Sequence, residues 1–259
     1  MTKPSAPLTG LCIAVTRPTR QAAALIERIR AAGGEAIALP LLEIVPPEEP
    51  LDASALRDRM ARAGIVIFIS PNAVRMALRI LPAAAWPTTP RLAAIGKGTA
   101  RVLGEAGFHE VIVPDEGADS DALLARPEFA NVPDQTILLV RGEGGRELLA
   151  RTLETRGAKV EHAIVYRRQP VPPNIAELRA TEAAILLVTS SEALRVLLKA
   201  ARTPGDVAWL RARRYVFGHP RIAALGQARG LHGIITDSPE DDALYTALVS
   251  LALQEESPP

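Results

Sequence analysis

The sequence contains two copies of one pattern, and this internal repeat constrains the fold more than any other feature. Four short blocks of the first half recur in the same order in the second half, at offsets of 120 to 124 residues. The paired blocks are Val15–Arg17 with Leu139–Arg141, Ser70–Arg75 with Ser190–Arg195, Ala94–Gly96 with Val216–Gly218, and Asp119–Leu123 with Glu240–Leu244. Four collinear matches at nearly one spacing predict two copies of a single five-stranded unit.

Short apolar runs alternate with amphipathic stretches along the whole chain. We expect strands at 11–15, 35–39, 65–69, 91–95, 111–113, 136–140, 159–165, 184–188, 215–217 and 233–235. Several of these runs are apolar at consecutive positions, which is typical of strands buried on both faces of a parallel sheet. The alternation predicts an α/β fold with mostly parallel sheets. Two such units facing each other would enclose a ligand cleft.

Composition excludes several classes of protein. The 30 Lys and Arg residues balance 29 Asp and Glu residues, whereas a general nucleic-acid binder needs a basic excess. The single cysteine, Cys12, excludes an intrachain disulfide and a cysteine-built metal site, and we expect it to be a small buried hydrophobe. The apolar run Leu11–Val15 is too short for a signal sequence, and no run reaches the length of a membrane span. We therefore expect a soluble cytoplasmic protein.

Prolines gather in two segments, 40–52 and 169–174. Each segment follows a predicted strand, so the order of strand and proline is duplicated like the rest of the repeat. We expect both segments to be linkers between the two units.

Six predicted strands end in a turn of small or polar residues at which a helix begins. Ser, Thr and Asn in these turns are typical N-caps, and Pro71 and Pro220 suit a first helical turn. Such residues either merely cap their helices or, because ligands bind at the carboxyl ends of parallel strands, help to hold an anion. The candidate binding residues are Arg17, Ser70, Pro71, Asn72, Gly96, Lys97, Thr99, Arg141, Gly142, Thr189, Ser190, Ser191 and Gly218. Six anion-binding loops would suit a ligand with many acidic groups.

Motifs for other chemistries are incomplete. Gly96–Thr99 lacks the first glycine of a P-loop, because Arg91 stands at that position. The glycine-rich run Arg141–Arg146 does not complete a G-x-G-x-x-G fingerprint. The four histidines lack metal-binding spacing, and no G-x-S-x-G nucleophile elbow is present. The sequence therefore predicts neither a nucleotide site nor a metal site.

Tyr166 ends the predicted strand 159–165 and precedes two arginines and a proline-rich segment. Alternation along a strand places Tyr166 and Arg168 on one face and Arg167 on the other. The tyrosine either packs at the rim against the linker or donates a proton or hydrogen bond into the cleft. Tyr166 is therefore the candidate catalytic residue.

Several of these segments together resemble the uroporphyrinogen-III synthase family. The blocks that carry the resemblance are Val15–Pro18, Ile67–Val74, Ile95–Ala100, Val140–Leu149, Val165–Arg168 and Asp237–Pro239. They are collinear over nearly the whole chain, and their combination is specific although no single block is. Gly218-His219-Pro220-Arg221 departs from the family's more usual Gly-x-x-Thr-Ala, which removes a hydroxyl contact there and leaves the backbone one.

The resemblance implies two flavodoxin-like, parallel-sheet domains that are interwoven, with the active-site cleft between them. Domain 1 would comprise residues 1–40 and 172–259, and domain 2 residues 46–165. Two crossover strands, 35–46 and 160–171, would form a two-stranded ladder between the domains. The repeat alone leaves two sequential domains open. The interwoven arrangement requires the strand at 11–15 to lie in a different sheet from the strand at 65–69.

The resemblance also implies an enzyme of heme biosynthesis, a hydro-lyase that cyclises linear hydroxymethylbilane to uroporphyrinogen III. The reaction inverts ring D and releases water, and the family uses no metal or cofactor. Tyr166 aligns with the family tyrosine thought to assist departure of the hydroxyl, while the loops, with Arg17 and Arg141 foremost, would hold the carboxylates. We expect a monomer that binds neither nucleic acid nor membrane and that contacts hydroxymethylbilane synthase transiently to receive its substrate.

Two functions of other classes remain open from the residues themselves. One is a two-lobed binding protein, but such proteins are typically exported and the missing signal sequence counts against it. The other is a flavodoxin-like phosphosugar or nucleotide enzyme, and the missing phosphate motif counts against that. Incubation with hydroxymethylbilane distinguishes all three.

Overall fold

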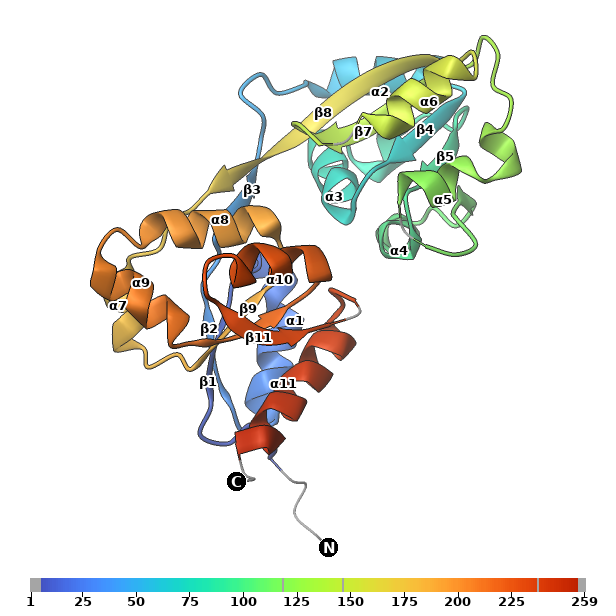
Figure 1. Ribbon diagram of the computed structural model, residues 1–259. Coiled ribbons are helices and arrows are strands. Elements are labelled where there is room, and N and C mark those ends of the chain that lie inside the picture. Colours follow the sequence, from blue (N-terminus) through green and yellow to red (C-terminus); the bar gives the residue numbers. More distant parts are fainter. Residues whose placement is uncertain (1–5, 118, 146, 237, 256–259) are drawn as a thin grey trace, which may run out of the picture. The chain divides into compact units, whose positions relative to one another are not determined.

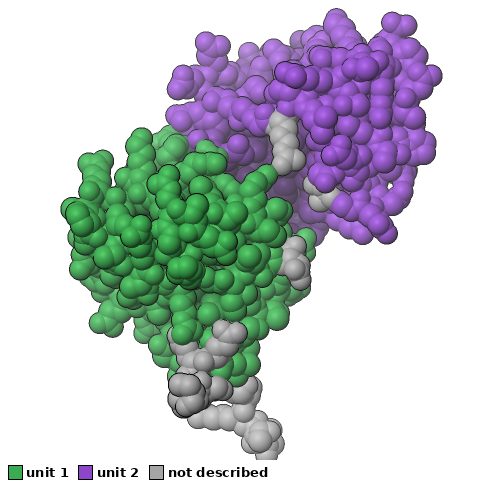
Figure 2. All heavy atoms as spheres, viewed as in Figure 1, with its two compact units in different colours: residues 1–43, 169–259 green, residues 44–168 purple. Residues whose placement is uncertain are grey.

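The computed structural model describes residues 6–117, 119–145, 147–236 and 238–255 (Figure 1). Arg146 and Asp237, which belong to two of the family-like blocks, lie outside the described residues. The chain divides into two compact units, coloured separately in Figure 2. Unit 1 comprises Met1–Glu43 and Gln169–Pro259, and unit 2 comprises Ile44–Arg168.

Unit 1 is built on a five-stranded sheet in which all neighbouring strands are parallel. Across the sheet the strands are β11 (His232–Ile235), β10 (Arg214–Phe217), β9 (Ile185–Val188), β1 (Cys12–Val15) and β2 (Glu35–Ala38). Ile13 and Val15 point to one face, where α1 (Thr19–Ala31) and α11 (Asp241–Glu255) cover them. Cys12 and Ala14 point to the other face, so Cys12 is the buried hydrophobe that was predicted. Four helices cover that face: α7 (Ile175–Ala180), α8 (Ser191–Ala200), α9 (Pro204–Arg211) and α10 (Pro220–Gln227).

Unit 2 has a six-stranded sheet, and five of its strands pair in parallel. Its strands are, in spatial order, β3 (Leu42–Val45), β8 (Lys159–Pro170), β7 (Thr136–Gly142), β4 (Ile65–Phe68), β5 (Arg91–Ala94) and β6 (Val111–Ile112). One face packs against α2 (Ala53–Arg62), α3 (Pro71–Ile80) and α4 (Lys97–Glu105). The other packs against α5 (Ser120–Leu124) and α6 (Leu148–Thr155). Two short 3₁₀ helices, Ala83–Ala85 and Pro127–Phe129, lie in connections.

The internal repeat is visible in the strand order of the two sheets. Unit 1 has the order β2-β1-β9-β10-β11, and unit 2 has β8-β7-β4-β5-β6 with β3 added at the edge beside β8. The repeat pairs β1 with β7, β9 with β4 and β10 with β5, so the two orders are equivalent and both are flavodoxin-like. Strand β1 lies between β2 and β9, whereas β4 belongs to the other sheet. The predicted α/β class with two parallel sheets is confirmed.

The two predicted linkers are partly strand. Residues 42–45 form β3, and β8 runs on to Pro170, so both segments contain sheet that the apolar runs alone did not predict, although both lie within the crossover strands that the family resemblance implied. Strand β3 lies next to β8, and beyond β8 the N–H of Val171 donates to the carbonyl of Leu41 at 2.9 Å. Proline is tolerated beside an edge strand, because the ladder there needs fewer N–H donors. Strand β3 carries the chain from unit 1 into unit 2, and β8 carries it back.

Crossing a bilayer requires a helix that is both long and strongly apolar, and the described part of the chain contains none.

Ser190 caps α8, and its hydroxyl contributes to the stability of unit 1. Its Oγ accepts from the N–H groups of Glu192 and Ala193, at 3.2 and 3.4 Å. We expect Ser190→Ala to lower the free energy of unfolding by about 1 kcal/mol, because two helix donors lose their acceptor. Ser191→Ala is the matched control, since the buried Ser191 Oγ has no hydrogen-bond partner within the described part of the chain. Equal stability of the two variants in urea unfolding would contradict the prediction.

Candidate active site

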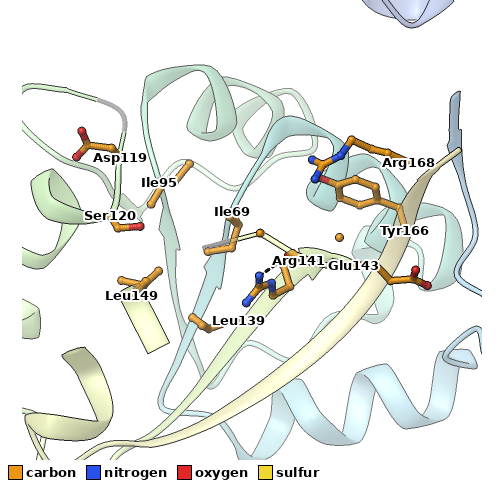
Figure 3. Close-up of a pocket in the computed structure, with 13 residues that line it drawn as sticks. Ile69, Ile95, Asp119, Ser120, Leu139, Arg141, Glu143, Leu149, Tyr166 and Arg168 are labelled. Atoms are coloured by element: carbon orange, nitrogen blue, oxygen red, sulfur yellow. Dashed lines mark hydrogen bonds between the residues drawn. The ribbon is translucent and has the colours of Figure 1, made fainter. Parts of the chain in front are cut away.

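A pocket of about 230 Å³ lies in unit 2 at the carboxyl ends of its strands (Figure 3). From β7 the chain winds to β8 on one side of the sheet, and from β4 it winds to β5 on the other. The pocket therefore lies at the point where the winding reverses, which is the usual ligand site of an open α/β sheet. Its walls comprise Ile69, Ile95, Asp119, Ser120, Leu139, Arg141, Gly142, Glu143, Gly144, Gly145, Leu149, Tyr166 and Arg168.

Arg141 lies in the middle of this pocket, at the end of β7 (Figure 3). Its side chain is buried, with 8% of its surface exposed. One guanidinium nitrogen pairs with Glu147 at 3.1 Å, and another donates to the carbonyl of Gly144. A buried charge needs such partners, and here both belong to the glycine-rich loop that follows β7. Arg141 therefore fixes this loop across the pocket, and its charge is opposed by a carboxylate.

Tyr166 lies on β8 beside the same loop, and 6% of its surface is exposed. The β7–β8 register shifts between Arg141 and Gly142, so Gly142 is paired with Tyr166. The phenol ring covers the Cα of Gly142 so closely that a Cβ there would be 2.5 Å from Tyr166 Cζ. The Tyr166 hydroxyl is 3.1 Å from Ser70 Oγ, at the start of α3. Arg168 lines the pocket together with Tyr166, as alternation along the strand predicts.

The other predicted residues of unit 2 begin α3 and α4. Ser70 is the N-cap of α3, and its Oγ accepts from the Ala73 N–H at 3.1 Å. Pro71 and Asn72 form the first turn of that helix. Gly96, Lys97 and Thr99 form the start of α4, which has no side-chain cap. These segments follow β4 and β5, so the structure brings all the predicted residues of unit 2 to one edge of its sheet.

The predicted residues of unit 1 lie at the carboxyl ends of β1, β9 and β10. Arg17 follows β1, pairs with Asp241 and donates to the carbonyl of Pro239. Thr189, Ser190 and Ser191 follow β9, and Gly218 follows β10. A Cβ at Gly218 would lie 3.0 Å from Thr189 Cγ2, so these two turns pack directly on each other. His219 caps α10 by accepting from the Arg221 N–H through Nδ1 at 3.0 Å.

The family model described as uroporphyrinogen-III synthase HemD matches residues 23–246. The chain belongs to the uroporphyrinogen-III synthase family. The uroporphyrinogen-III synthase of Salmonella typhimurium is 34% identical over 248 residues, which is 92% of this chain and 100% of that protein. The uroporphyrinogen-III synthase of Escherichia coli is 32% identical, with the same coverage of both proteins. The resemblance drawn from the sequence blocks is confirmed.

Solved structures of the family share the fold. A mutant uroporphyrinogen III synthase from Thermus thermophilus matches with a TM-score of 0.61 at 21% identity, over 95% of this chain and 100% of that one. The uroporphyrinogen-III synthetase of Helicobacter pylori also has a TM-score of 0.61, at 18% identity over 93% of this chain and 99% of that one. At these identities the likeness establishes the architecture alone.

The helices of this family member differ in how many first-turn N–H groups are available to bind an anion. Pro71 and Pro220 have no N–H, and the Ala73 and Arg221 N–H groups already donate to Ser70 and His219. By contrast, α1 and α4 begin without any side-chain cap. Their first-turn N–H groups therefore have fewer competing acceptors.

Some pocket residues were not predicted from the sequence. Asp119 belongs to a repeated block, and its Oδ1 caps α5 by accepting from the Ala122 N–H at 2.9 Å. Glu143 follows the predicted Gly142 directly and could have been found from that proximity alone. The contact between Ser70 and Tyr166 has no sequence signal, because 96 positions separate them. Within the described ranges, no three His, Cys, Asp or Glu side chains gather as a metal site requires.

Proposed function

We propose that this protein cyclises linear hydroxymethylbilane to uroporphyrinogen III, with inversion of ring D and loss of water, as a carbon–oxygen lyase of heme biosynthesis. Membership of the family supports the reaction. Within the site, the supporting observation is the position of Tyr166. This buried tyrosine lines the pocket together with Arg141 and Arg168, and its ring rests on Gly142.

In the proposed first step, Tyr166 donates its phenolic proton to the departing hydroxyl of the substrate. The C–O bond breaks, and its electron pair leaves with the oxygen as water. The lone pair of the adjacent pyrrole nitrogen delocalises toward the carbon that lost the hydroxyl, so the substrate becomes an azafulvene cation. Loss of its proton leaves Tyr166 as a phenolate. The phenolate regains a proton when the closed macrocycle loses one. Because the pyrrole already activates the leaving group, acid catalysis by Tyr166 contributes only modestly to the rate enhancement.

Ring inversion depends chiefly on how the flexible chain is held, since closure through a spiro route requires a particular fold of the substrate. We propose that the predicted residues of both units bind its carboxylates. The uncapped N-termini of α1 and α4 supply N–H donors, and Arg17 and Arg141 supply charge. Both arginines have acidic partners, Asp241 and Glu147, which a substrate carboxylate would replace.

The remaining expectations from the sequence belong to the same proposal. We propose that the two units correspond to two interwoven domains, residues 1–40 with 172–259 and residues 46–165, joined by crossovers at 35–46 and 160–171. The protein would act as a cytoplasmic monomer without a cofactor. It would receive its unstable substrate from hydroxymethylbilane synthase in a transient contact.

Incubation of the purified protein with hydroxymethylbilane tests the function. The product is oxidised and its isomers are separated. We expect type III, because direct closure without inversion gives type I. A product no richer in type III than a protein-free control would overturn the proposed function.

Distributed binding of the carboxylates predicts small effects from single truncations in the loops. We expect Thr189→Ala to raise KM up to about fivefold, or about 1 kcal/mol, with kcat unchanged, because one contact among many is lost. Thr203→Ala removes the N-cap of α9 in the same unit and serves as a control for lost stability. A folded Thr189→Ala protein without activity would contradict distributed binding.

A further inference from the structure

Ser70 makes two contacts through one oxygen atom. Its Oγ accepts a hydrogen bond from the Ala73 N–H at 3.1 Å, and it lies 3.1 Å from the hydroxyl oxygen of Tyr166. The first contact fixes the hydroxyl at the N-terminus of α3. The second joins α3 to β8, so one serine connects a helix start with the candidate catalytic phenol.

The donor and acceptor capacity of these groups limits how the pair can share its protons. A serine hydroxyl has one proton and two lone pairs, and the Ala73 N–H already occupies one lone pair. If Tyr166 donates to Ser70, the phenolic proton is used within the protein and the serine proton has no acceptor in this pair. If Ser70 donates to Tyr166, the phenolic proton stays free. The second arrangement is the only one that remains when the phenol has given up its proton.

We propose that Ser70 is a positioning residue that acts through Tyr166, by donating its hydroxyl proton to the phenolic oxygen. This inference rests on the proposed function, and it gives Ser70 this role in place of the carboxylate contact predicted for it from the sequence. The bond leaves the Tyr166 proton available to the departing hydroxyl of the substrate. Once that proton has moved, the bond becomes charge-assisted and stronger, so it favours the phenolate that the step produces.

The surroundings of Tyr166 give this bond a fixed geometry. The ring cannot retreat toward β7, because it already rests on Gly142 with no room for a Cβ between them. It packs in the same buried cluster as Ala163 and Val165, its neighbours on β8. The backbone of Tyr166 is held as well, since its carbonyl accepts from the Glu143 N–H at 2.8 Å. Because ring and backbone are fixed, the only conformational freedom left to the side chain is rotation of the phenolic O–H. The hydrogen bond from Ser70 fixes the direction of that O–H.

The test is a double-mutant cycle on kcat with hydroxymethylbilane as substrate. We expect Ser70→Ala to lower kcat about tenfold with KM unchanged, which corresponds to about 1.4 kcal/mol. Ser70→Gly should behave alike, because glycine preserves the helix start but has no hydroxyl. Ser70→Thr should restore most of the rate. In the Tyr166→Phe background, Ser70→Ala should have no further effect, because a residue that acts only through the phenol loses its role with it.

A second readout does not depend on turnover. The chain has three tyrosines, so Cζ-labelled tyrosine gives three carbon resonances, and Tyr166→Phe identifies one of them. Ser70→Ala should shift the Tyr166 resonance and leave those of Tyr215 and Tyr245 in place. Asp52→Ala is the matched control: Asp52 caps α2 in the same unit by accepting from the Ala55 N–H at 2.7 Å, outside the pocket. It should lower the melting temperature without moving the resonance or the rate.

The outcomes distinguish a failure of the role proposed for Ser70 from a failure of the proposed function. Additive losses in the double variant, or a raised KM with normal kcat in Ser70→Ala, would show that Ser70 acts independently, as a carboxylate contact would. An unmoved Tyr166 resonance would show that the bond is absent in solution. Either result overturns the role of Ser70 while an active wild-type protein keeps the proposed function. A wild-type protein that forms no type III product overturns both.

Discussion

Tyr166→Phe is expected to slow turnover of hydroxymethylbilane about 100-fold, while the product stays the type III isomer. The substitution keeps the ring on Gly142 and removes only the hydroxyl. General-acid catalysis typically contributes about 10²- to 10⁴-fold, and the low end applies here because the pyrrole nitrogen already activates the leaving group. Ring inversion should persist, because the loops that fold the substrate are unchanged. Quenched-flow or stopped assays with isomer analysis measure both quantities.

Tyr215→Phe is the matched control for this variant. Tyr215 is fully buried in unit 1, and its hydroxyl donates to the Leu210 carbonyl at 3.0 Å. Burial raises the pKa of Tyr215 above its usual value, so the group stays a neutral donor. Removing that hydroxyl should lower stability and leave turnover unchanged. Full activity in Tyr166→Phe would reduce Tyr166 to a rim contact, and a change to the type I isomer would mean that it positions ring D.

Gly142→Ala is expected to reduce turnover by about 100-fold or more, because the new methyl group occupies the position of the Tyr166 ring. The added Cβ would lie 2.5 Å from Cζ and 2.6 Å from Cε2 of that ring. The ring must therefore move, and it takes the hydroxyl away from Ser70 and from the substrate. Overpacking of this kind typically lowers the free energy of unfolding by about 1–3 kcal/mol. Steady-state kinetics and thermal unfolding measure the two effects.

Gly64→Ala supplies the comparison within the same unit. A Cβ at Gly64 would make one ordinary contact, 3.8 Å from the Thr136 carbonyl oxygen. This variant should retain full activity, so a loss in Gly142→Ala alone can be assigned to the ring. Combining Gly142→Ala with Tyr166→Phe should cost little more than Gly142→Ala, since both act on one hydroxyl. Normal turnover in Gly142→Ala would show that activity does not require the contact between the Tyr166 ring and Gly142 on β7.

The fold was largely predictable because the information for it is local and repeated. Runs such as Ile65–Ile69 are apolar at consecutive positions, and the equivalent blocks of the two halves place their strands in equivalent order. The ends of strands were less predictable. The residues alone predict a linker where β3 lies, because Pro40 and Pro46 flank it, whereas an edge strand beside β8 tolerates both prolines.

The candidate site was predictable as a set of loops and not as a set of contacts. Carboxyl ends of parallel strands share one edge, so the placement of Ser70, Gly96 and Arg141 in unit 2 follows from strand assignment. The irregular register between Arg141 and Gly142 has no sequence signal, and it decides which residue supports Tyr166. Contacts that depend on such local geometry, including the bond from Ser70, required the structure.

The two passages of the chain through β3 and β8 also determine the order in which the protein can be completed during synthesis. Unit 2 is continuous from Ile44 to Arg168, so all its strands are synthesised before β9. Strands β1 and β2 are synthesised before the strands of unit 2. However, β1 pairs with β9, in which Ile13 is opposite Ile185, so this side of the sheet cannot form until β9 has been synthesised. The earliest segment of the chain is therefore the last to be enclosed. Until then its apolar strands lack their sheet partner, and unpaired apolar strands of this kind are prone to aggregation.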